Sequence, residues 1–260
     1  MQPSGCMHIF FFMEPDFFIS MLADEDEANA SIAIRELLKY PDLQRTIAEY
    51  QDSDDPLVCR RIHQLASIKN RLDRMAEFPR LLDAGKLTHW QALSTINVIV
   101  DTRTSFQQLD DMLPKLLGDD IPIMRSPREF CNTIRDLGFS VDETNDNFIV
   151  KYLLMDAMAS FSGDPLVVGV ICQQLGALCG WNTTLGRLDN HVCLRDRFNN
   201  LCSLHPDDIR FRSNIRHFKP VSVRELSIEI LGKIHSAACI DQVTSVFLDT
   251  RTLLEQLQAQ

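Results

Sequence analysis

The chain has 260 residues, enough for one large domain or two small ones. Hydrophobic residues make up 45% and charged residues 24%, which is typical of a globular protein with a buried core. The formal net charge of −10 argues against general binding to nucleic acid or anionic membranes, because both require a basic surface. We therefore expect neither nucleic acid nor a membrane as a partner, and the composition leaves the oligomeric state open.

The first feature along the chain is the apolar run from Ile9 to Met13. It is far shorter than the ~20 residues of a membrane span. It also lacks the basic start and the small-residue cleavage site of a signal peptide. We expect residues 1–15 to form a flexible leader; the alternative is that the apolar run packs on the protein.

Helical patterns fill residues 16–120, which we predict to be a region of paired antiparallel helices. An acidic first turn opens the helix at residues 24–40, where it suits the positive end of the helix dipole. Pro56 takes the first position of the next helix. A capping box at residues 88–91 begins a third helix, and a fourth spans residues 106–118.

Turn-forming residues and a charge pair at Gly118–Pro122 mark the best internal boundary. We place the core of the protein after it, at residues 121–220. A capping box at Ser126–Glu129 opens the first core helix, and residues 146–160 are predicted to continue as helix. From residue 221 onward the chain is predicted to form a C-terminal helix pair, residues 221–260, packed on the core.

The stretch from Pro165 to Cys179 is apolar on nearly every side of the helical wheel, which is typical of a helix buried at the centre of a domain. Residues 181–187 and 191–195 are predicted to form a β-hairpin that turns at Leu188–Asn190. Alternation puts Val192 and Leu194 on one face and His191, Cys193 and Arg195 on the other. The predicted fold class is therefore α+β and mostly helical, with a small antiparallel sheet.

Four segments resemble one known pattern: Phe130–Phe139, which reads Phe-Cys-Asn-Thr-Ile-Arg-Asp-Leu-Gly-Phe, the loop Gly163–Val168, the Leu178–Gly180 stretch, and the strand Asn190–Arg195. Pro220–Leu226, which opens a helix pair, is similar to the closing segment of that pattern. Together they resemble the SirB-type, transglutaminase-like family of bacterial proteins over about residues 126–257. The resemblance implies a papain-like core, in which a central helix, a hairpin histidine and a helical lead-in surround the site.

The chain departs from this family at the positions that would carry chemistry. The family's loop serine falls on Val167, and the residues flanking its histidine become Asn190 and Val192. A family role that depends on that serine, or on the glycine that Asn190 replaces, does not carry over. Only His191 is left as a polar remnant of the site.

A cysteine nucleophile needs a helix N-terminus or a neighbouring imidazole to become a thiolate. The central helix offers Pro165 to Val168 in its first turn, and Cys172 lies ~10 Å further along its axis. Cys179 is at the wrong end, where the dipole opposes a thiolate. Cys193 is ~6–7 Å from His191 along a strand face, too far for a direct hydrogen bond. The sequence therefore favours a protein that is not an enzyme.

The eight cysteines form no Cys-x-x-Cys pair, and no His-x-His, His-Glu-x-x-His or glycine-rich nucleotide loop occurs. We predict no metal site and no cofactor. With no secretion signal, the cysteines are best explained as reduced, mostly buried thiols of a cytoplasmic protein.

Residues 186–219 form a basic island, in which seven basic and four acidic side chains leave a net charge of +3. Its arginines could pair with acidic residues elsewhere in the chain. Alternatively, the island could dock an acidic protein or an anionic ligand. The basic members are Arg187, Arg195, Arg197, Arg210, Arg212, Arg216 and Lys219.

Three functions follow from these patterns. We expect a non-catalytic transglutaminase-like binding or scaffold module, with Asn190, His191, Cys193 and Arg195 as candidate binding residues. His191 would line a groove or simply form a hydrogen bond across the hairpin. The alternative is a cysteine hydrolase or acyltransferase of the same fold with a migrated nucleophile. A third possibility is a purely helical adaptor with no sheet behind the central helix.

Overall fold

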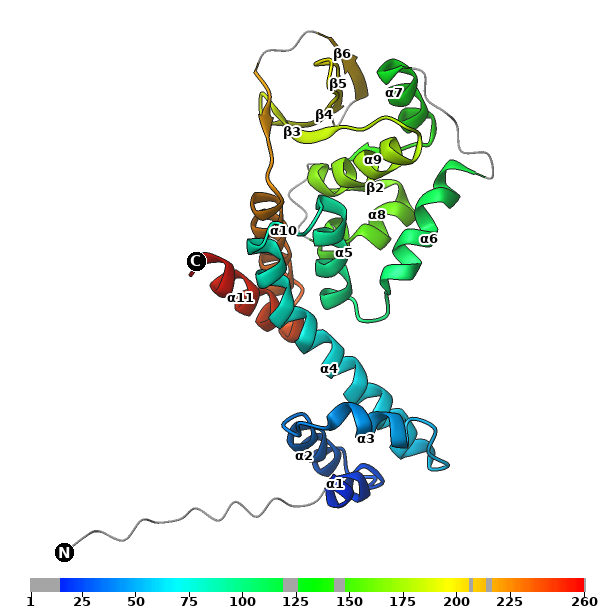
Figure 1. The fold of residues 1–260 in the computed structure, drawn as a ribbon, viewed down its shortest axis with the longest axis vertical. Helices are drawn as coiled ribbons and strands as arrows, with labels where there is room; N and C mark the ends of the chain where they lie inside the picture. The colour runs from blue at the N-terminus through cyan, green and yellow to red at the C-terminus, as the bar shows by residue number, and fades with distance from the viewer. Residues whose placement is uncertain (1–14, 119–125, 143–147, 206–207, 214–216, 260) are drawn as a thin grey trace, which may run out of the picture. The chain divides into compact units, whose positions relative to one another are not determined.

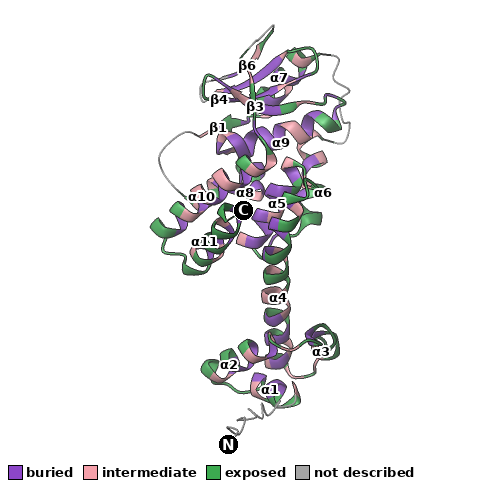
Figure 2. Cartoon of the chain, turned by 60° about the vertical axis from the view of Figure 1, so that its left-hand side comes forward, coloured by how far each residue is buried: buried purple, intermediate pink, exposed green. Residues whose placement is uncertain are grey.

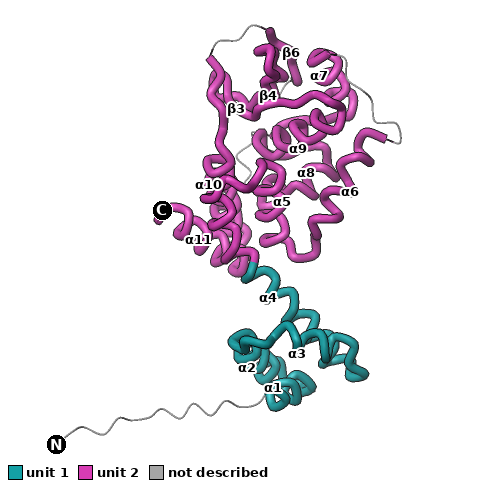
Figure 3. Tube along the Cα trace, in the orientation of Figure 1, with its two compact units in different colours: residues 1–73 teal, residues 74–260 magenta. Residues whose placement is uncertain are grey.

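A computed structural model describes residues 15–118, 126–142, 148–205, 208–213 and 217–259. The expected leader and most of the expected boundary at Gly118–Pro122 lie outside these residues, as does Arg216 of the basic island. The chain forms two compact units, one ending at Asp73 and the other beginning at Arg74 (Figure 3).

The first unit is helical. Its elements are α1 (Pro15–Leu22), α2 (Glu27–Leu37), α3 (Leu43–Tyr50) and the first part of α4 (Pro56–Asp83). As predicted, α4 begins with proline at its first position, and Asp55 caps it by accepting a hydrogen bond from Leu57 N. The apolar faces meet in one core, formed by Phe18, Ile19, Leu22, Ala33, Ile34, Leu37, Leu43, Ile47, Val58, Ile62 and Leu65.

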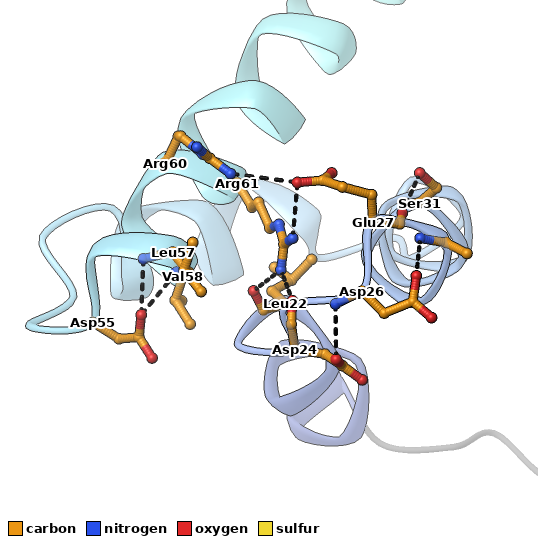
Figure 4. A network of polar contacts seen from close by, with 11 residues as sticks. Leu22, Asp24, Asp26, Glu27, Ser31, Asp55, Leu57, Val58, Arg60 and Arg61 are labelled. Atoms are coloured by element: carbon orange, nitrogen blue, oxygen red, sulfur yellow. Dashed lines mark hydrogen bonds and ion pairs between the residues drawn. The ribbon is translucent and has the colours of Figure 1, made fainter.

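In the first unit, a buried arginine of α4 forms hydrogen bonds to the end of α1 (Figure 4). Arg61 of α4 is only 1% exposed. Its Nη1 donates to the backbone oxygens of Leu22, at 2.7 Å, and Asp24, and its Nη2 lies 3.1 Å from Glu27 Oε1. The guanidinium thus supplies a donor to the buried carbonyl group of Leu22, which ends α1, and it also donates to the part-buried carbonyl group of Asp24.

The second unit contains the remaining helices and the sheet (Figure 1). Its helices are the second part of α4, from Arg74 on, together with α5 (His89–Val100), α6 (Phe106–Leu117), α7 (Pro127–Asp136), the 3-10 turn η1 (Ile149–Tyr152), α8 (Leu154–Ser160), α9 (Pro165–Leu178), α10 (Val223–Ile240) and α11 (Thr244–Gln258). The predicted capping box at Thr88 is present, and Gly118 ends α6 with φ 83°. Helices α5 and α6 therefore belong to the same compact unit as the sheet.

Five antiparallel strands form the sheet, in the order β6-β5-β4-β3-β7. The strands are β3 (Thr184–Leu188), β4 (His191–Arg195), β5 (Leu201–His205), β6 (Asp208–Arg212) and β7 (Lys219–Pro220), and a separate parallel pair joins β1 (Ser140–Val141) to β2 (Ser162–Gly163). The predicted hairpin turns at Asp189 and Asn190, whose φ angles of 50° and 68° are those of a two-residue hairpin turn. The α+β fold class is confirmed, and the purely helical adaptor is wrong.

Helix α9 is the centre of the second unit. It packs against β3, β4 and β5 on one side and against α5, α6 and α8 on the other (Figure 1). Nine of its 14 residues are buried (Figure 2). A Cβ on Gly169 would lie 2.8 Å from Leu185 Cδ1, so glycine allows the helix to approach the sheet closely.

The prediction of continuous helix over residues 146–160 is wrong in its described part. Leu153, with φ −101° and ψ 134°, is extended and separates η1 from α8. The Lys151 carbonyl accepts a hydrogen bond from Asp164 N at 3.0 Å. This carbonyl therefore bonds to the residue before α9 and not to a later residue of a continuous helix. A tertiary contact therefore breaks a pattern that is locally helical.

Strands β5 to β7 were not predicted. Arg210 and Arg212 alternate with Ile209 and Phe211 along β6, which is the pattern of a strand with one buried face. Because this stretch is rich in charged residues, the alternation was not recognised in the sequence.

Candidate functional site

The resemblance to the transglutaminase-like family predicts a thiol-bearing position at the first turn of α9, and this turn is closed. Asp164 caps the helix, with its Oδ1 accepting from Leu166 N at 2.9 Å. Leu166, Val167 and Val168 are each at most 1% exposed. The first turn therefore presents no nucleophile and no open surface.

Beside this turn lies a chain of three ion pairs from three elements. Asp164 Oδ2 is 2.7 Å from Lys233 Nζ, and the same ammonium is 3.0 Å from Glu229 Oε1. Glu229 Oε2 lies 2.5 Å from Arg187 Nη2 of β3. The chain ties the start of α9 to α10 and to the hairpin.

Burial and pairing act in opposite directions on these groups. Burial opposes the ionised form of Glu229, but hydrogen bonds from Arg187 and Lys233 outweigh it and lower the pKa of the carboxyl. Burial also opposes charge on Lys233, and the neighbouring Asp164 charge more than compensates, so the pKa of the ammonium is raised. Both groups are held in their charged forms and neither is poised to exchange a proton near neutral pH.

Three of the four predicted binding residues lie on one face of β4, and the fourth lies in the turn before it. Val192 and Leu194 face α9, so His191, Cys193 and Arg195 point away from it. The His191 ring centroid is 4.5 Å from that of His205 on β5. Asn190 is a turn residue with positive φ, and its position is explained by the turn alone.

Cys193 does not form a catalytic pair with His191. Its Sγ lies 3.7 Å from the backbone oxygen of Gly186, to which the thiol donates. Burial raises the pKa of this thiol to about 12, although the charges of Arg212 and Arg195 act against the increase. Burial also raises the pKa of Cys172 strongly. Both cysteines are packing residues in this geometry.

We call the side of β4, β5 and β6 turned away from α9 the outer sheet face. Residues that pair across neighbouring strands form rows on this face. One row contains Arg195, Leu201 and Arg212, and the next row contains Cys193, Ser203 and Arg210. By this register, its residues are His191, Cys193, Arg195, Leu201, Ser203, His205, Asp208, Arg210 and Arg212.

The basic island is therefore not one surface. Arg187 and Lys219 pair with Glu229 and Glu225 of α10. Arg195, Arg210 and Arg212 belong to the outer sheet face, where the Arg195 guanidinium lies 4.2 Å from the centroid of the Phe218 ring. The intramolecular alternative therefore holds for Arg187 and Lys219, while docking of an acidic partner stays a prediction.

A groove between α5, α6 and the end of α9 was missed by the sequence reasoning. Its volume is about 740 Å³, and polar side chains, among them Gln91, Thr95, Asp110 and Gln174, line it beside apolar ones. Trp90 Nε1 donates to Asp110 Oδ1 at 2.8 Å across its wall. Gln91 and Thr95 lie four residues apart on one helical face, which was the available signal.

Among the residues that the structure describes, no group of three or more His, Cys, Asp or Glu side chains could hold a metal ion. None of the described helices is long and apolar enough to span a lipid bilayer. Comparisons with family models, curated proteins and solved structures found no match to this chain. The function must therefore be argued from the geometry, and the transglutaminase-like family stays a prediction.

Proposed function

We propose that this chain is a non-catalytic binding module with a degenerate transglutaminase-like core, and that its outer sheet face binds an acidic protein segment. The absence of catalysis is inferred from the residues at the start of α9. There, buried Leu166, Val167 and Val168 replace a nucleophile, and Asp164 is engaged by the helix and by Lys233. Acyl transfer through a cysteine requires a reachable, ionisable thiol at that place.

The second half rests on the arginines of the outer sheet face. Arg210 and Arg212 are exposed and Arg195 is half-buried. The nearest buried carboxylate in sequence, Asp196, is already occupied, since it accepts from Phe198 N at 2.8 Å and Asn200 N at 2.9 Å. In a chain of net charge −10, such a local positive surface would orient an acidic partner toward this face.

We also propose a cytoplasmic location. Cysteines 131, 172, 179, 193 and 202 are all buried, and none of them is in a disulfide. Unpaired cysteines are usual in a reducing compartment.

Thiol labelling tests the absence of cysteine catalysis. With iodoacetamide near neutral pH, we expect Cys239, which is exposed, to react, while Cys172 and Cys193 stay unmodified in the native protein. Peptide mass spectrometry measures the modification at each cysteine. Stoichiometric labelling of Cys172 or Cys193 that is lost in His191→Ala would instead support the cysteine hydrolase or acyltransferase.

Binding of a fluorescent oligoglutamate peptide tests the acidic partner. We expect Arg212→Glu to weaken binding by about tenfold or more, because one attraction becomes a repulsion. Arg45→Glu changes an exposed arginine of the other compact unit by the same charge and is expected to leave the affinity unchanged. Fluorescence anisotropy at low salt measures both, and equal losses in the two variants would remove the proposed surface.

A further inference from the structure

The groove between α5, α6 and the end of α9 shares no residue with the outer sheet face, and twelve of the described residues line it. Each of the three helices contributes side chains one turn apart: Trp90 and Ser94 from α5, Phe106 and Asp110 from α6, and Gln174 and Leu178 from α9. Its volume of about 740 Å³ is within the ~300–1,000 Å³ of pockets that hold small organic molecules. A stable protein partner usually contacts about 20–30 residues, so the groove suits a small molecule better.

One part of the groove wall is apolar and open to solvent. Phe106 is 38% exposed and Leu178 is 40% exposed, which is unusual for large apolar side chains in a concave site. The Arg74 guanidinium lies 4.8 Å from the centroid of the Phe106 ring, and the ring stays exposed despite this contact. An apolar ligand body would cover these side chains.

The polar part of the wall contains a carboxylate that is held in place. Trp90 is only 7% exposed, and its Nε1 donates to Asp110 Oδ1 at 2.8 Å. Within the described parts of the chain, no lysine or arginine forms an ion pair with Asp110, and none lines the groove. Asp110 is therefore an oriented negative charge without a cationic partner in the protein.

Two further polar groups of the wall lack their usual partners. Pro114 is inside α6 and has no N–H, so the Asp110 carbonyl group loses the donor that an α-helix would give it four residues later. Ser94 is 2% exposed, and its Oγ has no hydrogen-bond partner among the described residues. Because buried polar groups are nearly always paired, these groups point to a polar ligand that occupies the groove.

We infer that this groove binds a small organic molecule that carries a primary ammonium group on an apolar body. The ammonium group would pair with the Asp110 carboxylate, since it brings a positive charge and donors to a wall with an unpaired carboxylate. The apolar body would lie on Phe106 and Leu178. This inference is independent of the proposed function, because the two sites have no residue in common.

Three compounds with the same phenyl ring and two-carbon chain test the chemistry: phenethylamine, phenethyl alcohol and hydrocinnamate. We expect the amine to bind about fivefold or more tightly than the alcohol, because only the amine forms an ion pair with Asp110. The carboxylate of hydrocinnamate is repelled and should not bind measurably.

Nuclear magnetic resonance measures the affinity and the place of binding together. The chain has two tryptophans, so its proton–nitrogen correlation spectrum contains two indole N–H signals, which Trp90→Phe assigns. The Trp90 signal should move as phenethylamine is added, because this N–H lies in the groove wall. Trp181 does not line the groove, and its signal should move far less.

Two neighbouring carboxylates provide a matched pair of variants. Asp110→Asn removes the charge but keeps an oxygen that accepts from Trp90, so it should weaken amine binding about fivefold and leave alcohol binding unchanged. Asp111→Asn removes the same charge from an exposed residue of α6 that does not line the groove and pairs with Gln107. It should leave both affinities unchanged, and circular dichroism verifies that each variant is folded.

Several outcomes would overturn the inference. They are an alcohol that binds as tightly as the amine, equal losses in Asp110→Asn and Asp111→Asn, a Trp90 signal that does not move, or no binding of phenethylamine at all. A helical apolar peptide with blocked ends and one lysine forms a further arm. Tighter binding of this peptide than of phenethylamine would overturn the small molecule as the occupant of the groove.

Discussion

At the scale of single residues, the outer sheet face depends on Gly186. A Cβ at this position would lie 2.3 Å from Phe218 Cζ and 2.5 Å from the backbone oxygen of Lys219. Neither contact is tolerable, and one of the two partners is backbone. The absence of a side chain at Gly186 therefore lets Phe218 lie on the sheet and support Arg195.

We predict that Gly186→Ala lowers the free energy of unfolding by about 1–3 kcal/mol, because the Phe218 ring and β7 must shift. The matched control is Gly232→Ala on α10, where a Cβ meets no atom within 4 Å. That change should raise the free energy of unfolding by up to about 1 kcal/mol, through helix propensity. Urea denaturation measures both, and equal effects of the two substitutions would contradict the packing argument.

At the scale of elements, the ion-pair chain of Arg187, Glu229, Lys233 and Asp164 joins β3, α10 and the start of α9. Asp164 is the most buried member, its side chain being only 6% exposed. A buried carboxylate is costly unless it is paired and hydrogen-bonded, and here both conditions are met. The charges thus join three elements of the second unit at the start of α9.

This arrangement predicts how stability depends on pH. The pKa of Glu229 is lowered in the folded state, so its contribution is present above the unfolded value of about 4.3 and is lost as pH falls through the folded pKa. We expect Glu229→Gln to cost about 1–2 kcal/mol at pH 7, and the difference from the unchanged protein to disappear in acid.

The control for this prediction is Glu255→Gln, which removes an exposed partner of Arg251 on α11. Because exposed pairs contribute little, we expect its effect to stay within about 0.5 kcal/mol at every pH. Chemical denaturation repeated between pH 3 and pH 8 gives both profiles. A cost of Glu229→Gln that does not change with pH would show that the ion pairs are not its cause.

At the scale of the whole molecule, the chain divides within α4 into two compact units with separate cores. Both tryptophans, Trp90 and Trp181, belong to the second unit. Tryptophan fluorescence therefore reports on the second unit alone, whereas far-ultraviolet circular dichroism reports on the helices of both. This difference allows the stability of each unit to be measured separately.

We predict that Arg61→Met destabilises the first unit by about 1–3 kcal/mol, since the carbonyl groups of Leu22 and Asp24 lose their donor. The dichroism transition should begin at lower urea, while the fluorescence midpoint should not move. Arg60→Met changes the exposed neighbour, whose side chain is 66% exposed, and should alter neither signal. A parallel shift of the fluorescence midpoint in Arg61→Met would mean that the units unfold together.

Several features were predictable because their causes are local. The capping box at Thr88, the proline start of α4 and the turn at Asp189 and Asn190 depend on neighbouring residues only. The burial of α9 was also predictable, because a helix that is apolar on all sides has no face for solvent. One feature of the candidate site was also predictable. Strand alternation puts His191, Cys193 and Arg195 on the same side of β4.

What the sequence by itself determined is the capped helices, the buried helix α9, the β3–β4 hairpin and the absence of a nucleophile at the start of α9, since all of these depend on residue type and short spacing. The tertiary structure decided what fills that place and where the arginines go. Asp164 and Lys233 are 69 residues apart, and Arg187 and Glu229 are 42 apart. Arg195 and Arg212 lie in one row because β5 pairs with β4 on one side and with β6 on the other. Pairings over such separations depend on strand register and helix packing, which no local pattern encodes.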